Sequence, residues 1–475
     1  MERTASVSEN PKSKCFIISQ RCILCILSCC AIACSYVGTL AFTNTLRYMS
    51  DRKYPIPQSN ETCPAEGQTE YNYRMGYYYT WDQTAQAILR CSRYISYILI
   101  HVPAGYLADQ FGGKQVLMVA LLGMSFFCFI IPTVVQISNE NCVFVVVVKI
   151  LSGLFEGAIY PSVNAVLAQW TPDKDRTSTA CYVYTGAPIG VIMAIILTNS
   201  VAIVTRHWPS VFYFFGSVLV ILCGAWKLFA YSAPEIHPCI TNKERNYLEE
   251  ELEGNVIFGR KPVPWTDITR SGPLWALIVI HMGHNWGWFI LMNYFPFYVI
   301  QILRFQVTNN FMWTWIPFFF MWILAIIFAC LSDWLIYDNY VNVTTVRKIF
   351  TTIGVLGPAL FLLLASFTTC KQIINIIWMI SAVSLMGGYY TGTNVIILDL
   401  APNFAGTVMG IVSGFGAFVA MLTPIVTTFL TPQNTLHQWQ EVFWVTAIIL
   451  GVTTLIFLIF GSAERQQWND VDVDF

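Results

Sequence analysis

Long apolar segments separated by short polar connections are the feature that most constrains this chain. Of its 475 residues, 56% are hydrophobic and only 11% are charged, whereas about 25% are charged in an average soluble protein. A helix needs about 20 apolar residues to cross a bilayer. Twelve segments of that kind are predicted, with approximate limits of 22–49, 83–108, 115–137, 142–170, 178–204, 208–232, 273–303, 310–336, 348–367, 371–400, 402–431 and 439–462. The expected fold is an all-α membrane protein with twelve transmembrane helices.

The distribution of Lys and Arg predicts the orientation of these helices. Cytoplasmic loops of membrane proteins carry an excess of both residues. With a cytoplasmic N-terminus, sixteen of the 26 Lys and Arg residues fall on the cytoplasmic side and seven on the other side. Both termini of this multi-pass protein are therefore expected in the cytoplasm. A plasma membrane and a lysosomal or vesicular membrane fit this arrangement equally well.

Two long connections divide the chain into regions. The expected order is a cytoplasmic N-terminal tail (1–21), a six-helix half (22–232), a cytoplasmic central loop (233–270), a second six-helix half (271–462) and a cytoplasmic tail (463–475). The central loop is charged, as expected for a connection in water, and it leaves six predicted helices on each side.

The other long connection, at 50–82, is expected outside the cell or in a lumen. It contains the sequon Asn60-Glu61-Thr62, so Asn60 is a predicted glycosylation site. Cys63, Cys142 and Cys370 all fall near the same predicted face. Cys63 and Cys142 are a candidate disulfide pair, although the sequence does not fix the connectivity.

The two halves resemble each other at a constant spacing. Gly157, Asn164, Pro172 and Gly186 lie 230 residues before Gly387, Asn394, Pro402 and Gly416. Asp109, in GYLADQFGGK, has a rough counterpart in Asp333 of CLSDWL. Parallel repeats of six helices are typical of transporters whose substrate binds between the halves, near the middle of the bilayer. The repeat therefore predicts two pseudo-symmetric halves.

Lys149, Glu156, Arg90 and Arg93 are ionisable residues deep inside predicted helices of the first half. Such residues inside a membrane usually face a water-filled cavity or a partner. Lys149 and Glu156 are seven residues apart and share one helix face. They form either a structural ion pair or a coupling switch in which a carboxyl group loads and releases a proton. Arg90 and Arg93, one turn apart, either bind an anion or extend toward the membrane interface.

Several stretches resemble the major facilitator superfamily. GYLADQFGGKQVL at 105–117 is similar to the loop between the second and third helices of that superfamily. Five others resemble its anion–cation symporter branch, which includes sialin, the vesicular glutamate transporters and the type I sodium–phosphate cotransporters. These are GLFEGAIYPSVNAVLAQWTP (153–172), HNWGWFILMNYFPFYVIQILRF (284–305), TTVRKI (344–349), DLAPNFAGTVMGI (399–411) and FGSAERQQW (460–468). The resemblance extends from the second predicted helix to the C-terminus.

The resemblance implies roles for individual residues. Glu156 matches the membrane-embedded glutamate that takes part in proton coupling in the family. Lys149 stands where the family generally has an arginine. The first-helix arginine of the family is missing, because its frame reads Thr39-Leu40-Ala41 here. His284-Asn285-Trp286 is similar to the sialin and phosphate-transporter members.

The remaining candidates fall into two groups. A central cavity is expected to bind substrate through Arg90, Arg93, Tyr160, His284, Asn285 and Asn394. A gate is expected at Gly105, Asp109, Gly112, Gly113 and Lys114. In that gate Asp109 pairs with a cation or a helix N-terminus in one conformation and releases it in the other. The alternative for Asp109 is a solvated loop charge.

Together these features predict a secondary active transporter. It would move a small organic anion or inorganic phosphate with a proton or sodium gradient, by alternating access. The missing first-helix arginine supports an alternative, a transporter-fold receptor or scaffold that has lost transport. The net charge of −1 suggests no nucleic-acid partner, and no metal-ligand, cofactor or enzyme motif stands out. We expect a monomer in the lipid bilayer.

Overall fold

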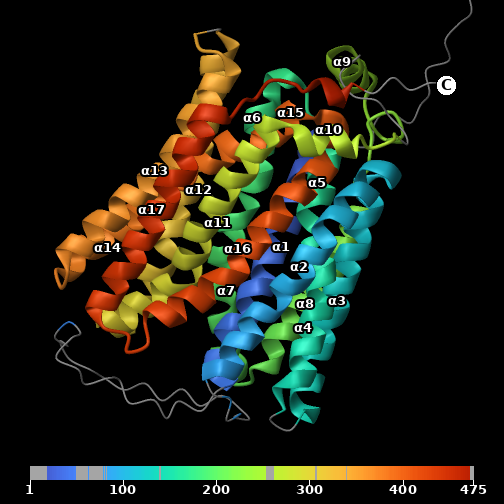
Figure 1. Cartoon of the computed structure of the whole chain (residues 1–475). Coiled ribbons are helices and arrows are strands. Elements are labelled where there is room, and N and C mark those ends of the chain that lie inside the picture. The colour runs from blue at the N-terminus through green and yellow to red at the C-terminus, as the bar shows by residue number, and fades with distance from the viewer. Residues whose placement is uncertain are drawn as a thin grey trace, which may run out of the picture.

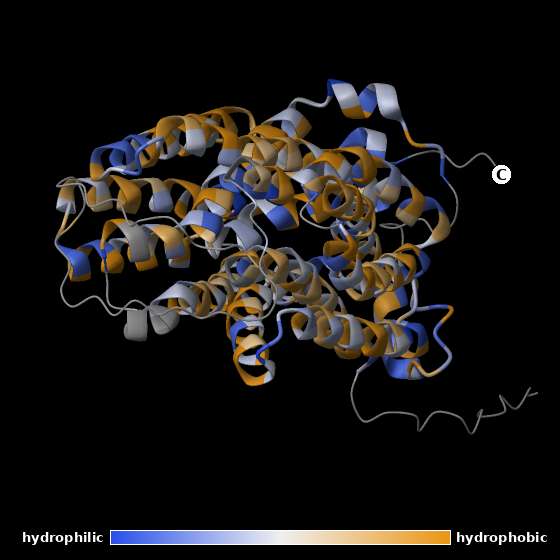
Figure 2. Cartoon of the chain, turned by 90° about the horizontal axis from the view of Figure 1, so that it is seen from below, coloured by the Kyte–Doolittle hydropathy of each residue, from blue (hydrophilic) through white to orange (hydrophobic). Residues whose placement is uncertain are grey.

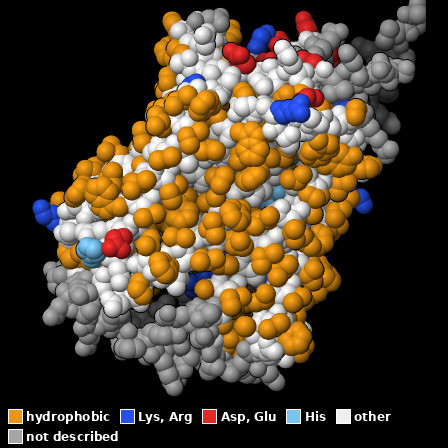
Figure 3. All heavy atoms as spheres, viewed as in Figure 1, with side chains coloured by type: hydrophobic (Ala, Val, Ile, Leu, Met, Phe, Trp, Pro, Cys, Tyr) orange, Lys and Arg blue, Asp and Glu red, His pale blue; other side chains and the backbone are white. Residues whose placement is uncertain are grey.

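The computed structural model describes residues 19–49, 83–138, 141–252, 261–304, 307–338 and 340–470, together with Cys63, Tyr79 and Trp81. Nearly all of these residues are helical, and most of the helices run side by side through one bundle (Figure 1). Hydrophobic side chains cover the flank of the bundle, while charged side chains gather toward its ends (Figure 3). This is the surface expected of a protein whose solvent is lipid. The predicted all-α membrane fold is confirmed.

The first half contains α1 (Gln20–Met49), α2 (Gln83–Phe111), α3 (Gly113–Ile137), α4 (Cys142–Gly157), α5 (Ile159–Trp170), α6 (Arg176–Tyr184), α7 (Gly186–Thr205) and α8 (Pro209–Phe229). Between the halves lie α9 (Asn242–Leu252) and α10 (Trp265–Arg270). The second half contains α11 (Gly272–Phe297), the π-helix η2 (Tyr298–Ile302), α12 (Val307–Tyr337), α13 (Val343–Thr368), α14 (Gln372–Leu385), the π-helix η3 (Tyr390–Asn394), α15 (Val395–Leu400), α16 (Ala405–Leu430) and α17 (Leu436–Phe460).

Twelve crossings follow from this order. Eleven stretches in the described part of the chain are long and apolar enough to span a membrane. The other crossing is α2, which has the length but is less apolar because it carries Arg90, Arg93 and His101. Viewed from one end, the helices of the bundle carry both hydrophobic and hydrophilic residues (Figure 2).

The helix breaks support the internal repeat. The fourth crossing breaks between α4, which ends at Gly157, and α5, which begins at Ile159. At the corresponding place in the second half, α14 ends at Leu385 and η3 begins at Tyr390. Turns with π-helical hydrogen bonding are frequent at functional sites. Each half therefore has an interrupted helix near the middle of the bundle.

The bundle has two distinct ends. We call the end that carries α9 and α10 the central-loop face (top of Figure 1) and the other end the disulfide face. Both described ends of the chain lie on the central-loop face. The Gln20 N–H donates to Glu244 of α9 (3.2 Å), and the Gln466 N–H donates to the Leu400 carbonyl at the end of α15 (3.0 Å). The cytoplasmic location of this face stays a prediction.

The candidate pairing of Cys63 with Cys142 is wrong. Cys63 is bonded to Cys370, which lies between α13 and α14, and Cys142 is a free thiol. The Cys63 N–H also donates to the Ile302 carbonyl at the end of η2 (3.2 Å). Because the two cysteines are 307 residues apart, only their tertiary positions identify them as partners. The bond joins the first half to the second. Asn60 lies outside the described residues, so its glycosylation stays a prediction.

A cleavage experiment tests this cross-link. A protease site inserted at 253–260, between α9 and α10, divides the chain into two fragments, each with one of the bonded cysteines. After cleavage the fragments should migrate together on a non-reducing gel and separately after reduction. In a Cys370→Ser control they should separate under both conditions. Separation of the wild-type fragments without a reductant would contradict the bond.

Candidate functional site

A cavity between the two halves contains most of the predicted binding residues. Its volume is about 90 Å³, and α1, α2, α4, α5, α11, η3 and α16 contribute to its wall. One water molecule occupies about 30 Å³ in the liquid, so this volume corresponds to about three waters or a small solute. The predicted residues that line it are Arg93, Glu156, Tyr160, His284, Asn285 and Asn394.

Close helix packing brings Arg93 and Glu156 to the same part of this wall. Gly153 of α4 lies against α2, where an added Cβ atom would be 2.9 Å from the Arg93 carbonyl oxygen. Only glycine permits that approach without displacement of the backbone. Glu156 follows Gly153 by three residues, so it lies on a neighbouring part of the α4 surface.

Arg93 is a buried cation that still has hydrogen-bonding capacity. It is 4% exposed, and its Nη2 donates to the Tyr94 hydroxyl (2.9 Å). Its guanidinium carbon lies 4.8 Å from the centroid of the Tyr94 ring. Its Nε has no hydrogen-bond partner among the described residues. Because a guanidinium offers five N–H donors in a fork that matches an oxyanion, Arg93 is suited to hold an anionic substrate in the cavity.

Glu156 faces neutral hydroxyl groups. It is 6% exposed, it accepts a hydrogen bond from the Thr39 hydroxyl, and the Tyr97 hydroxyl is also hydrogen-bonded to it. Of the ion pairs among the described residues, none joins Glu156 to Lys149. Lys149 is 3% exposed, and its ammonium lies 4.5 Å from the centroid of the Phe42 ring, outside the cavity wall.

The second half contributes imidazole, amide and phenol groups. The Tyr389 hydroxyl is hydrogen-bonded to Nδ1 of His281. The His284 ring stacks on the Tyr389 ring with centroids 3.4 Å apart. Asn285 donates to the His281 carbonyl (2.8 Å). Nδ1 of His284 and Oδ1 of Asn394 are buried and have no hydrogen-bond partner in the described part of the chain.

Sequence reasoning missed several lining residues that a helical spacing rule would have found. Tyr97 follows Arg93 by four residues on α2, and His281 precedes Asn285 by four residues on α11. Side chains four apart share a helix face, so each predicted residue points to its neighbour. Thr39 stands in the frame where the family's first-helix arginine is missing, and the structure adds that it lines the cavity and donates to Glu156.

Arg90 does not join this wall, although it is one turn from Arg93. The cavity lining contains Arg93 but not Arg90. Arg90 lies beside Tyr294 of α11, and the part of the chain that the structure describes offers its Nε no hydrogen-bond partner. Because α2 begins at the disulfide face with Gln83, Arg90 is nearer to that face than the cavity is.

The predicted gate residue Asp109 lies at a helix N-terminus of the other half. Its Oδ1 accepts from the Gly406 N–H (3.0 Å). Its Oδ2 accepts from the N–H (2.6 Å) and the hydroxyl (2.7 Å) of Thr407. The first N–H groups of a helix lack partners within that helix and carry partial positive charge. Asp109 therefore caps α16, while its gating role stays a prediction.

Asp333 makes the equivalent contact in the opposite direction. It belongs to α12 of the second half and accepts from the N–H of Ser178 (2.9 Å) and from the Ser178 hydroxyl. Ser178 lies in the first turn of α6, which begins at Arg176. Each half thus caps a helix of the other half. Asp109 and Asp333, which correspond in the predicted repeat, therefore also make corresponding contacts.

The other gate residues support these contacts from within α2 and α3. At Gly105 a Cβ atom would lie 2.7 Å from the Gly406 carbonyl carbon, so the approach of α2 to α16 requires glycine. Gly112 has φ 93°, a conformation that favours glycine. At Gly113 a Cβ atom would lie 2.6 Å from the side chain of Val166. Lys114 lies over the Tyr231 ring, 3.6 Å from its centroid, within its own half.

Further polar contacts that the sequence did not predict close the central-loop face. Asp399 is paired with Arg347 (2.9 Å) of its own half and with Arg176 (3.2 Å) of the first half. Lys261 donates to the side chain (2.7 Å) and the carbonyl (3.1 Å) of Asn403. Burial lowers the pKa of Lys261 to about 8, against the opposing charge of Asp109. The cavity is therefore separated from the central-loop face by bonded groups.

Replacement of either capping carboxylate should loosen this face. Loss of a cap costs about 1–2 kcal/mol, which changes an equilibrium by about fivefold to thirtyfold. Cys181 of α6 is buried against α12 of the second half. Its rate of alkylation therefore reports how often this face opens. Asp109→Ala and Asp333→Ala, which remove the accepting oxygens, should each raise its alkylation rate by about tenfold, measured by mass spectrometry of the Cys181 peptide.

Two controls accompany that measurement. Asp267→Ala on α10 removes a carboxylate that is exposed in this structure, and it should leave the rate unchanged. Cys223 is buried within the first half, and its unchanged alkylation excludes general unfolding. Equal Cys181 rates in the wild type and both variants would show that the caps do not hold the face closed.

Comparison with known proteins identifies relatives that share this membrane-spanning helical fold. Residues 24–424 match the model of the Major Facilitator Superfamily. A Drosophila ananassae protein provisionally named an inorganic phosphate cotransporter is 32% identical over 88% of this chain and 90% of its own length. Human sialin is 30% identical over 86% of this chain and 82% of its own length. The structure of the proton:xylose symporter XylE covers 94% of this chain and 97% of its own, with a TM-score of 0.68 at 11% identity.

Proposed function

The chain belongs to the anion–cation symporter branch of the major facilitator superfamily, and from that premise we propose that it moves a small anion across a membrane together with a proton, by alternating access. Its relatives are transporters and not enzymes. One observation carries the proposal. A buried guanidinium with unused hydrogen-bonding capacity and a buried carboxyl group without an ion-pair partner in the described structure line the same cavity between the halves.

Glu156 is the proposed proton carrier. A carboxylate buried among hydroxyl groups exchanges its proton when the polarity around it changes. Thr39 and Tyr97 donate hydrogen bonds that stabilise the ionised form, and Arg93 adds a positive charge nearby. An anion that occupies Arg93 would remove part of that positive influence, so that proton uptake by Glu156 becomes more favourable. The anion and the proton would then bind cooperatively.

The proposed conformational change breaks the two reciprocal caps. In this structure Asp109 and Asp333 fasten the halves at the central-loop face. Opening of that face requires both carboxylates to leave the helix N-termini and become hydrated. In the proposed orientation this face is cytoplasmic, so the structure corresponds to a carrier closed toward the cytoplasm.

Replacement of Glu156 tests the coupling. In proteoliposomes, Glu156→Gln should reduce anion accumulation driven by a proton gradient to background, because an amide cannot carry the proton. Exchange of external for internal anion without a gradient should continue. Glu441→Gln, at a half-exposed site on α17, should behave as the wild type. Gradient-driven accumulation by Glu156→Gln equal to the wild type would exclude Glu156, and dependence on sodium alone would exclude proton coupling.

A second substitution series tests the anion site. Hydrogen bonds to charged groups contribute about 1.5–3 kcal/mol, which corresponds to about tenfold to hundredfold in affinity. Arg93→Gln should therefore raise the anion concentration for half-maximal exchange by at least about tenfold. Arg90→Gln is the matched comparison on the same helix outside the cavity, and it should change that concentration less. Equal effects would place the site elsewhere along α2.

The same assay separates transport from a receptor that has lost it. A receptor would show anion-dependent thermal stabilisation that Arg93→Gln abolishes, without exchange or accumulation under any proton or sodium gradient. That result would replace the proposed transport function.

A further inference from the structure

The C-terminal tail is bound to the second half at the central-loop face. The Gln466 side chain accepts a hydrogen bond from the Ser271 hydroxyl at the start of α11 (3.2 Å). The Trp468 ring lies near the Phe404 ring, just before α16, with centroids 6.4 Å apart. The tail therefore crosses from the beginning of α11 to the beginning of α16, the helix that Asp109 caps.

Asn403 is bonded to the tail through both of its nitrogen atoms. It lies in the short turn η4 (Pro402–Phe404), directly before α16. Its backbone N–H donates to Oδ1 of Asn469 (2.9 Å), and its Nδ2 donates to the Asn469 carbonyl (3.1 Å). Asn469 is 0% exposed. Because a carbonyl oxygen only accepts hydrogen bonds, this contact decides which end of the Asn403 amide faces the tail.

Lys261 of the central loop is bonded to the other end of that amide. Its ammonium donates to Oδ1 of Asn403 (2.7 Å) and to the Asn403 carbonyl (3.1 Å). An ammonium group has donors and no acceptor, so a rotated amide would turn its own N–H groups toward Lys261 and lose the shorter bond. The Asn403 side chain therefore has one orientation that satisfies the tail and Lys261 together.

The same lysine joins the two halves. Its carbonyl accepts from the side chain of Gln110, near the end of α2 in the first half, while its ammonium is bonded to Asn403 in the second half. We call these contacts the Lys261 bridge. Lys261 is 6% exposed and forms no ion pair among the described residues. Its charge therefore depends on the oxygens of Asn403 and, at longer range, on Asp109.

We propose that the C-terminal tail is a positioning element for closure of the central-loop face, in which Asn469 orients Asn403 to receive Lys261. The inference rests on the proposed opening of this face during transport, and it adds a segment outside the bundle that sets how often the face opens. Release of the tail frees the Asn403 amide to rotate, weakens the Lys261 bridge and favours the open arrangement.

Alkylation of Cys181 in the full-length chain measures this opening. Lys261→Met keeps the backbone contact with Gln110 and removes a charged donor, so it should raise the alkylation rate by at least about tenfold. The tail variant, Trp468→Ala with Asn469→Ala, removes an aromatic contact and a buried hydrogen bond, and it should raise the rate by about fivefold.

Each variant has a matched control at an exposed site. Gln467→Ala changes the exposed residue between the two tail substitutions, and Lys243→Met removes an exposed ammonium on α9. Both controls should alkylate at the wild-type rate. Cys223, buried within the first half, should also keep its wild-type rate in every variant. An equal rise at Cys223 and Cys181 would indicate general unfolding and would overturn the inference.

Combined variants separate positioning from a merely structural role. If the tail acts through Lys261, adding the tail variant to Lys261→Met should give no further increase. Asn403→Asp presents an oxygen to Lys261 in either orientation, so adding the tail variant to it should leave its rate unchanged. Additive increases, or a tail effect that persists with Asn403→Asp, would overturn the positioning role.

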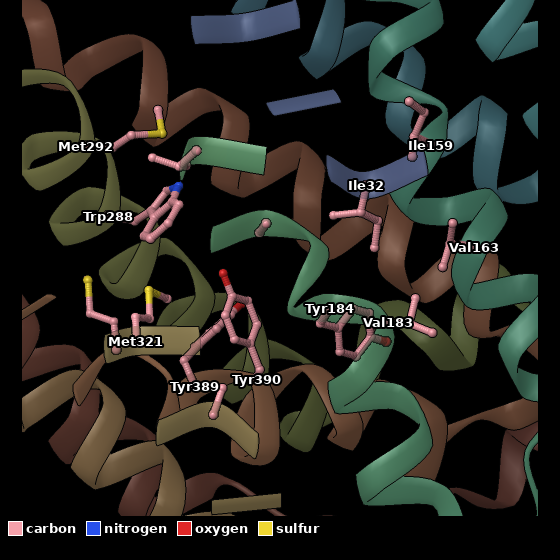
Figure 4. Packing of buried hydrophobic residues seen from close by; sticks show 14 of the residues in the cluster. Ile32, Ile159, Val163, Val183, Tyr184, Trp288, Met292, Met321, Tyr389 and Tyr390 are labelled. Carbon is pink, nitrogen blue, oxygen red and sulfur yellow. The ribbon is translucent and has the colours of Figure 1, made fainter. Parts of the chain in front are cut away.

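Failure of this inference is distinguishable from failure of the proposed function. None of the residues of the bridge lines the cavity, whereas Trp288, Tyr389 and Tyr390, shown in Figure 4, do. Anion exchange in proteoliposomes should therefore continue in these variants. Wild-type alkylation rates in Lys261→Met and in the tail variant would overturn the inference and leave transport standing. The absence of exchange in the wild type would count against the proposed function, while the alkylation rates would still decide the role of the tail.

Discussion

The two reciprocal contacts of a carboxylate with a helix N-terminus organise this structure. Asp109 of the first half caps α16 of the second, and Asp333 of the second half caps α6 of the first. Each contact satisfies backbone N–H groups that would otherwise be exposed at an interface between two six-helix bodies. The bodies meet at the central-loop face through these contacts, and the cavity lies deeper between them. Because the contacts are polar and reversible, they hold one arrangement of the halves without making it permanent.

The disulfide at the other face is a different kind of link. Cys63 and Cys370 join the halves covalently, whereas the central-loop face depends on hydrogen bonds and ion pairs such as Asp399 with Arg176 and Arg347. One face is therefore held by contacts that water can replace, and the other carries a bond that persists while the halves move. Their different chemistry suits a carrier in which the closed face must open without separation of the two bodies.

The charged groups in and near the cavity are best considered together. A buried charge without a partner is costly, yet Arg93 and Glu156 remain beside an aromatic wall. Arg93 keeps an N–H without a partner, and Glu156 is held by hydroxyl groups. In the proposed transport cycle, Arg93 would accept the anion and Glu156 the proton. Lys149 is separated from this wall and packs on Phe42, so its contribution is the long-range charge that it adds.

The sequence by itself determined the membrane fold, the twelve crossings and the repeat, because apolar length and regular spacing are local properties that a chain carries in its order. It also identified Arg93, Glu156, Tyr160, His284, Asn285 and Asn394, since polar residues are conspicuous in apolar segments. Only the tertiary structure separated Arg93 from Arg90 and Glu156 from Lys149, because position across a helix interface depends on packing at residues such as Gly153. It also replaced Cys142 by Cys370 as the partner of Cys63. Contacts between residues hundreds of positions apart are decided by how the two halves meet, which no local pattern records.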